Sequence, residues 1–289
     1  MVRWAIALGG GGPVGIAWET GVLAGLAASG VDPREAALVV GTSAGSVVGT
    51  QVARGRDPLA EYETLLTRGD ERRVARSEPD LETMQRIFAL WGSFEEMTEE
   101  ARRAIGELAL AARTPPEEEF LSAFVLDDAW PEAPLVTTAV DCVSGAFVAF
   151  DRSSGVSLRR AVAASCAVPG IFPPVTIDGR RYMDGGVRSV TNADLTLRAK
   201  PDAVLVVAPV TQGTAQRVGR VGSLQVEREI TELRAAGVRT ALIAPGEAER
   251  EAFGPNLMDP TRRKPAAEAG YAQGLRAAAE VRALLAGGS

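Results

Sequence analysis

The sequence contains no histidine, and this absence excludes several classes of chemistry. A Ser-His-Asp triad, a Cys-His pair, and zinc or haem held by imidazole all need that side chain. Lysine occurs only at Lys200 and Lys264, so Schiff-base chemistry has few candidates. Cys142 and Cys166 are too few for a disulfide framework or a zinc site, and we interpret both as buried small hydrophobes.

Long hydrophobic runs and excess positive charge are also lacking. No segment approaches the ~20 apolar residues of a membrane span, and the apolar run at the N-terminus is too short for a signal peptide. The 289 residues have a formal net charge of −6, which argues against a nucleic-acid partner and gives no attraction to anionic lipids. We therefore predict a cytoplasmic protein that binds no nucleic acid. Transient contact with a membrane surface stays open, and the sequence indicates no oligomeric state.

The chain begins with the alternation of strands, glycine turns and helices that is typical of a parallel α/β sheet. Residues 3–8 read as a buried strand, the glycines at 9–12 interrupt it, and helical spacing follows over 16–29. A second apolar strand at 37–40 leads through a tight turn into a small-residue helix over 44–54. This order predicts an α/β fold with a mainly parallel central sheet.

Residues 58–125 differ from this pattern, since they are rich in Glu, Arg, Leu and Ala and show no strand signal. Their apolar spacing predicts two to four amphipathic helices inserted into the sheet order, serving either as a structural layer or as a cap over a site. Strand patterns return after residue 135, and an alanine-rich helix is expected over 266–285. We predict one domain over residues 1–289 with this helical insertion.

The segment Gly41-Thr42-Ser43-Ala44-Gly45 fits the nucleophile-elbow pattern G-x-S-x-G. This chemistry needs a serine on a strained strand-to-helix turn, with glycines that let neighbouring backbone pack closely. The helix that follows directs its positive end at a developing oxyanion. An apolar strand precedes the pattern and a small-residue helix follows it, as an elbow requires, although an ordinary glycine-rich turn remains the alternative.

A second glycine-rich segment, Gly9-Gly10-Gly11-Gly12, lies between the first strand and the first helix. Its backbone N–H groups could converge on an anion, either a dinucleotide pyrophosphate or an acyl-transfer oxyanion. A dinucleotide site expects an acid at the end of the second strand, but Asp32 and Glu35 precede that strand. The oxyanion interpretation is therefore favoured, and no G-K-[ST] sequence follows to form a Walker loop.

Without histidine, a carboxylate must activate the serine. Asp184 is the best candidate because it ends a hairpin strand and precedes Gly185-Gly186, which permit a sharp turn and close approach. Asp141, Asp151 and Asp178 also lie at strand ends or turns, where we expect structural roles. A free aspartate, with a pKa of ~3.9, is a weak base for an alcohol, and partial burial would raise that pKa.

Together these segments resemble the patatin-like phospholipase family of serine–aspartate lipid acyl hydrolases. Three blocks occur in the family's order: Gly10-Gly11-Gly12-Pro13-Val14-Gly15, Gly41–Gly45, and residues 164–186 ending in Asp184-Gly185-Gly186. The resemblance implies a three-layer α/β/α fold, Ser43 as nucleophile, Asp184 as general base, and an oxyanion hole of the N–H groups of Gly10, Gly11 and Gly12. It implies a lipid ester substrate, an acyl-enzyme, and no metal or organic cofactor.

One position departs from the family pattern. The family usually carries Arg or Lys where this chain has Val14, and the preceding Pro13 has no N–H to donate. We expect weaker or narrower activity from this difference. A non-catalytic protein that binds lipid or acyl groups on the same fold is the main alternative, and a nucleotide-binding protein is a remote one. Headgroup and chain-length preference are not encoded in any motif.

Overall fold

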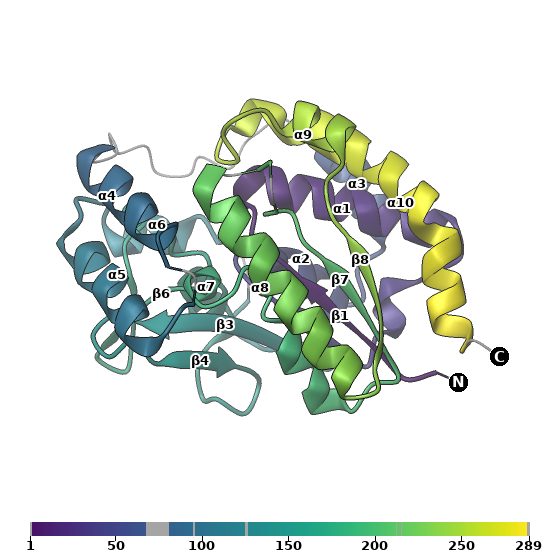
Figure 1. Cartoon of the computed structure of the whole chain (residues 1–289), viewed down its shortest axis with the longest axis horizontal. Coiled ribbons are helices and arrows are strands. Elements are labelled where there is room, and N and C mark those ends of the chain that lie inside the picture. Colours follow the sequence, from purple (N-terminus) through teal and green to yellow (C-terminus); the bar gives the residue numbers. More distant parts are fainter. Residues whose placement is uncertain are drawn as a thin grey trace.

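The computed structural model describes residues 2–67, 81–94, 96–124, 127–211, 213–214 and 216–287. Its centre is a sheet with helices on both faces, the α/β/α arrangement expected from the sequence (Figure 1). The strands are β1 (Trp4–Leu8), β2 (Leu38–Gly41), β3 (Leu135–Asp141), β4 (Phe147–Phe150), β5 (Val175–Ile177), β6 (Arg180–Asp184), β7 (Ala203–Val207) and β8 (Arg239–Ile243). The α-helices are α1 (Gly12–Ala28), α2 (Ala44–Ala53), α3 (Pro58–Thr67), α4 (Leu81–Trp91), α5 (Glu99–Ala111), α6 (Glu117–Ser122), α7 (Leu158–Ser165), α8 (Gln216–Ala235), α9 (Glu247–Phe253) and α10 (Arg263–Ala286). Short 3-10 helices are η1 (Pro33–Glu35), η2 (Gly185–Val187), η3 (Ala193–Ala199) and η4 (Pro260–Arg262).

The sheet is mainly parallel, in the order β5-β6-β3-β2-β1-β7-β8, with β4 pairing β3. The run from β3 through β2, β1 and β7 to β8 is parallel, whereas β4, β5 and β6 pair in antiparallel fashion. Asp178 and Gly179 join β5 to β6 with φ angles of 48° and 75°, as a type I′ hairpin requires. The expected sheet is thus confirmed.

Alternate residues of the parallel strands supply the two faces of the core. In β1, Ile6 and Leu8 pack with α1, α2 and α10, while Ala5 and Ala7 belong to the cluster that includes α4, α5 and α8. Figure 1 shows α8 lying across this second face. Both faces of the strands are buried, which is why their sequences read as continuous apolar runs.

The predicted helical insertion is present between β2 and β3. Its described residues form α3 to α6 and include no strand, while residues 68–80 fall outside the described part. Ile87 and Trp91 of α4 and Ile105 of α5 are buried in the second core cluster. In α6, Phe120 belongs to a third cluster, beside α7 and β6. The single domain over residues 1–289 stays a prediction.

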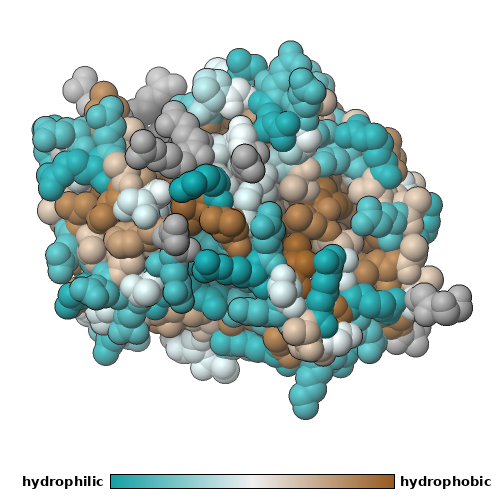
Figure 2. All heavy atoms as spheres, in the orientation of Figure 1, coloured by the Kyte–Doolittle hydropathy of each residue, from teal (hydrophilic) through white to brown (hydrophobic). Residues whose placement is uncertain are grey.

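The surface carries apolar side chains on both sides of α8. Figure 2 shows them beside α4 and α5 and over β8, separated by hydrophilic side chains. The exposed leucines of these elements include Leu110 of α5 and Leu242 of β8. Among the helices that the structure describes, none combines the length and apolar character needed to traverse a bilayer.

Candidate active site

Ser43 lies on a strained turn between β2 and α2. Its φ of 52° and ψ of −117° are unusual for a residue other than glycine, and such strain is typical of a nucleophile elbow. The glycines at either end permit this turn: a Cβ at Gly41 would meet the Gly45 carbonyl at 2.5 Å, and one at Gly45 would overlap the Leu8 carbonyl. The hydroxyl therefore stands at the carboxyl end of the sheet, at the start of α2.

Two residues at the C-terminal end of α7 hold the backbone of Ser43 in place. The Ser43 N–H donates to the hydroxyl of Ser165 at 2.9 Å, and the Cys166 thiol donates to the Ser43 carbonyl at 3.3 Å. Both partners lie in the block of residues 164–186 on which the family resemblance rests, but their contact with Ser43 is not visible in the sequence. They make the strained turn part of a fixed framework.

The pairing of β3 explains how Asp184 reaches this turn. One edge of β3 pairs with β4. The first part of its other edge pairs with β2, where Gly41 lies opposite Thr137. The last part of that edge pairs with β6, where Asp184 lies opposite Ala139. Strand β6 therefore approaches the point where β2 ends. The carboxyl group of Asp184 meets the hydroxyl of Ser43 there and accepts its hydrogen bond.

The carboxyl group of Asp184 is cut off from water, with the residue only 2% exposed. Burial raises its pKa to about 7, although hydrogen bonds from Ser43 and from the Gly186 N–H, at 2.7 Å, act in the opposite direction. A base with a pKa near neutrality is better matched to taking a proton from an alcohol than a free aspartate is. The structure therefore brings together the two residues that the sequence singled out.

The glycine-rich loop lies directly against Ser43, since a Cβ added at Gly10 would be 3.4 Å from the Ser43 Cβ. The Gly10 N–H already donates to the Val190 carbonyl at 2.8 Å. Within the described part of the chain, the N–H groups of Gly11 and Gly12 have no backbone acceptor. Gly12 also opens α1, so the positive end of that 17-residue helix lies at the same place.

Ala44 is a further candidate donor to an oxyanion, and the sequence analysis did not name it. It is the first residue of α2, and its N–H has no backbone acceptor among the described residues. The elbow pattern itself contains the signal, because the residue after the nucleophile supplies an oxyanion donor in related turns. The arrangement therefore offers Gly11, Gly12 and Ala44 as unused donors, while the N–H of Gly10 is engaged elsewhere.

A buried polar network lies beneath the dyad and also escaped sequence analysis. The Asn192 side-chain amide donates to the Thr42 hydroxyl at 3.0 Å and to the Ser189 carbonyl at 2.7 Å, and the Thr138 hydroxyl donates to Thr42 at 3.0 Å. Asn192 has a left-handed φ of 48°, which asparagine tolerates well. The network ties the residue before Ser43 to β3 and to the turn after Asp184.

The rival acids have structural partners. Asp141 accepts the N–H groups of Val143 and Ser144 at 2.9 and 3.0 Å. Asp151 accepts the N–H of Ser153 at 2.8 Å, and Asp178 forms the β5–β6 hairpin turn. None of these interactions involves Ser43.

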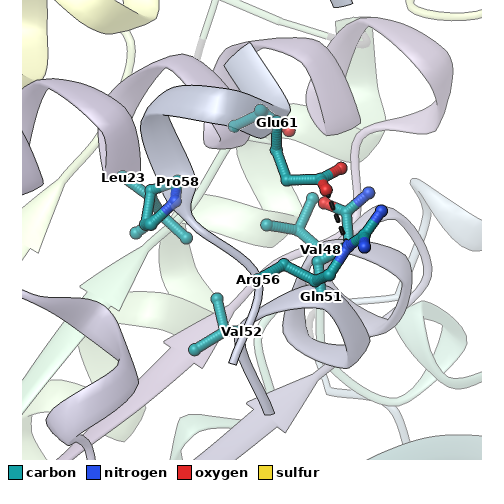
Figure 3. Close-up of a pocket in the computed structure, with 8 residues that line it drawn as sticks. Leu23, Val48, Gln51, Val52, Arg56, Pro58 and Glu61 are labelled. Carbon is teal, nitrogen blue, oxygen red and sulfur yellow. Dashed lines mark hydrogen bonds and ion pairs between the residues drawn. The ribbon is translucent and has the colours of Figure 1, made fainter. Parts of the chain in front are cut away.

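Two hollows in the described structure lie away from Ser43. One, of about 10 Å³, has room for a single water and lies where α1 and α2 meet the Arg56–Glu61 ion pair (Figure 3). The other, about 470 Å³, is lined by Arg3, Leu38 and Leu135 at the amino ends of the parallel strands. Ligands of open α/β sheets bind at the carboxyl ends, where Ser43 lies. Among the described residues, no cluster of His, Cys, Asp or Glu could hold a metal ion.

The chain is similar in sequence and fold to known proteins. A family model described as patatin-like phospholipase matches residues 6–197, the part that contains Ser43, Asp184 and the glycine-rich loop. The uncharacterized NTE family protein Mb1092c of Mycobacterium bovis is 30% identical over 205 residues, which cover 68% of this chain and 48% of the relative. The chain thus spans about half the length of the curated relatives it matches.

A solved structure, that of VipD, has the same fold. VipD from Legionella pneumophila aligns with a TM-score of 0.50 at 14% identity, covering 96% of this chain and 67% of VipD. The type III effector protein ExoU aligns with a TM-score of 0.46 at 17% identity, covering 96% and 53% of the two chains. The extent of the family match and the identity to Mb1092c decide the assignment: this chain belongs to the patatin-like phospholipase family.

Proposed function

We propose that the protein is a serine hydrolase that cleaves carboxylic esters of lipids, phospholipids or acylglycerols, through a Ser43–Asp184 dyad. The observation that carries this proposal is the hydrogen bond between the Ser43 hydroxyl and the buried Asp184 carboxyl group, whose pKa is raised to about 7. Family membership supports a lipid substrate. No other group with a suitable pKa contacts Ser43 in the described structure.

In the first half of the reaction, the Ser43 oxygen attacks the ester carbonyl while its proton passes to Asp184. The carbonyl oxygen becomes an oxyanion, which the unused N–H groups of Gly11, Gly12 and Ala44 stabilise at the ends of α1 and α2. The carbon–oxygen bond to the alcohol then breaks, and Asp184 returns the proton to the departing oxygen. The acyl group remains on Ser43 as an ester.

In the second half, water replaces the alcohol. Asp184 takes a proton from the water as its oxygen attacks the acyl carbon, the bond to Ser43 breaks, and the proton returns to the Ser43 oxygen. The products are a carboxylic acid and the free enzyme. Because Asp184 both takes and gives a proton in each half, a pKa near the working pH serves the reaction.

Labelling with a fluorophosphonate tests the nucleophile. We expect the wild-type protein to be labelled at Ser43 and Ser43→Ala to stay unlabelled. Asp184→Asn should abolish hydrolysis of p-nitrophenyl esters, while Asp178→Asn serves as the matched control, since it makes the same change in a hairpin turn away from Ser43. Full activity of a folded Asp184→Asn protein would contradict the mechanism.

A non-catalytic lipid-binding protein is the second candidate, and Val14 favours it. This side chain is fully buried where the family usually carries a cation, and the preceding Pro13 offers no N–H. Fatty acid retained through purification, together with no labelling and no turnover of any ester, would support this alternative.

A further inference from the structure

The connection between α9 and α10 lies against the glycine-rich loop. The Val14 N–H donates to the Leu257 carbonyl at 3.2 Å. A Cβ added at Gly12 would be 2.8 Å from the Met258 sulfur and 2.9 Å from the Leu257 carbonyl oxygen. This connection follows the part of the chain that the family model matches, which ends at residue 197. The family pattern therefore does not specify what covers the loop here.

Met258 also packs on the apolar cluster beside the dyad. The fully buried members of this cluster include Phe120 of α6 and Ala167, and its half-buried members include Val168 and Ile171. Ala167 is close to the dyad along the backbone, because its carbonyl accepts the Asp184 N–H at 3.0 Å. Met258 thus connects the glycine-rich loop on one side with the apolar wall beside Asp184 on the other.

The connection has a defined conformation of its own. The Met258 N–H donates to the Asn256 side chain at 3.0 Å, and Asp259 accepts the Thr261 N–H at 2.9 Å. In this arrangement Ser43 is only 5% exposed, and Met258 lies against the neighbouring glycine-rich loop. Methionine suits this position because its unbranched, flexible side chain changes shape at little cost.

We propose that Met258 determines which acyl chains reach Ser43. Its side chain lies between the glycine-rich loop and the apolar cluster that includes Phe120 and Ala167, and an ester's acyl chain takes that place when Met258 turns aside. The bound chain is therefore aliphatic, and the size of residue 258 sets the length that fits. This inference rests on the proposed function, since it concerns the substrate of the same serine.

Chain-length selectivity tests the inference. Met258→Ala should raise kcat/KM for p-nitrophenyl decanoate relative to p-nitrophenyl acetate by about tenfold, because it vacates apolar space. Met258→Phe should lower the same ratio. Leu275→Ala, an exposed leucine on α10, is the control and should leave the ratio unchanged. Damage to the fold would lower both rates together, so an unchanged ratio in both Met258 variants overturns the inference.

Binding without turnover separates this inference from the proposed function. In a Ser43→Ala background, Met258→Ala should tighten binding of a fluorescent C18 fatty acid by about tenfold and leave acetate binding unchanged. If the wild-type protein hydrolyses no ester but this tightening occurs, the proposed function fails and the role of Met258 stands. If esters are hydrolysed but neither chain-length ratio nor fatty-acid affinity responds, Met258 has only a structural role. If no ester is hydrolysed and no fatty acid binds, both are overturned.

Discussion

The backbone N–H of Ser43 donates a 2.9 Å hydrogen bond to the hydroxyl of Ser165, a fully buried residue at the end of α7. This bond joins the nucleophile's strained turn to the segment that also contacts Asp184. Its loss would leave a buried N–H unsatisfied and free the turn to relax.

Ser165→Ala should therefore lower both stability and activity. We expect the free energy of unfolding to fall by about 1–3 kcal/mol, the cost of an unsatisfied buried donor, and kcat to fall more than KM rises. Urea unfolding and ester kinetics measure the two effects. Ser93→Ala, which removes an exposed hydroxyl, is the control. A Ser165→Ala protein with wild-type kcat would show that the turn needs no such support.

The raised pKa of Asp184 predicts an acidic limb in the pH–rate profile. The group must be ionised to act as a base, so kcat/KM should fall about tenfold for each pH unit below about 7. Measurement from pH 5 to 9 with a short-chain ester checks this expectation. A limb centred near pH 4 would mean that water reaches the carboxylate in the working enzyme.

The raised pKa of Asp184 also makes the stability of the fold depend on pH. Because the folded pKa lies above the unfolded value of 3.8, the folded state holds this proton more tightly between those pH values. The contribution to stability is complete below about pH 3.8 and is lost as pH rises through about 7. Burial also raises the pKa of Glu229 to about 7, so the difference between wild type and Asp184→Asn isolates the part that belongs to Asp184.

Local patterns in the sequence predicted the elbow and the strands correctly, because strand, turn and helix follow one another within a few residues. The start of α1 was expected at residue 16 but lies at Gly12, where Pro13 suits the first turn of a helix. Helix α8 begins at Gln216, and two glycines lie in its first two turns. Gly219 and Gly222 pack against the carbonyls of Thr214 and Val210. These glycines therefore allow close backbone contacts and do not mark the end of a helix.

Long-range contacts explain what the sequence left undecided. From the residues alone Asp184 was one acid among several, because its approach to Ser43 depends on β6 pairing with β3. The contact between Asn192 and Thr42 joins residues 150 positions apart, and no motif marks it. No sequence pattern predicted helix α9 or the position of Met258. The contact of Met258 with the glycine-rich loop arises only when the chain folds back over that loop.

We expect Asn192 to be required both for the left-handed backbone conformation at this position and for the polar network beneath the dyad. Asn192→Gly keeps the left-handed conformation but removes the side-chain amide that bonds Thr42 and the Ser189 carbonyl. We expect a loss of about 2–4 kcal/mol in the free energy of unfolding, since the buried Ser189 carbonyl loses the amide donor and the Thr42 hydroxyl keeps only Thr138 as its donor. Asn192→Ala adds backbone strain and should cost more. Equal stability of the two variants in urea unfolding would contradict the backbone part of this argument.

Glu19 gives a prediction in the opposite direction, toward greater stability. It is fully buried in α1, and neither carboxyl oxygen has a hydrogen-bond partner in the described structure. Burial raises its pKa well above 4.5, and the backbone of Gly9 offsets this only in part, because the Gly9 N–H already donates to the Val207 carbonyl at 2.9 Å. Stability from this group is complete below about pH 4.5 and is lost as pH rises through the folded pKa.

Glu19→Met should therefore stabilise the protein by about 1–3 kcal/mol at pH 8, because it replaces an unpartnered buried polar group with an apolar one of similar length. The gain should be smaller at pH 5, where the folded wild-type protein holds Glu19 neutral at less cost. Urea unfolding at both pH values measures the difference, and Glu232→Met on α8 is the control. A Glu19→Met protein less stable than wild type at pH 8 would mean that the carboxyl group has a bound water as partner, since such a water would lose its site in the variant.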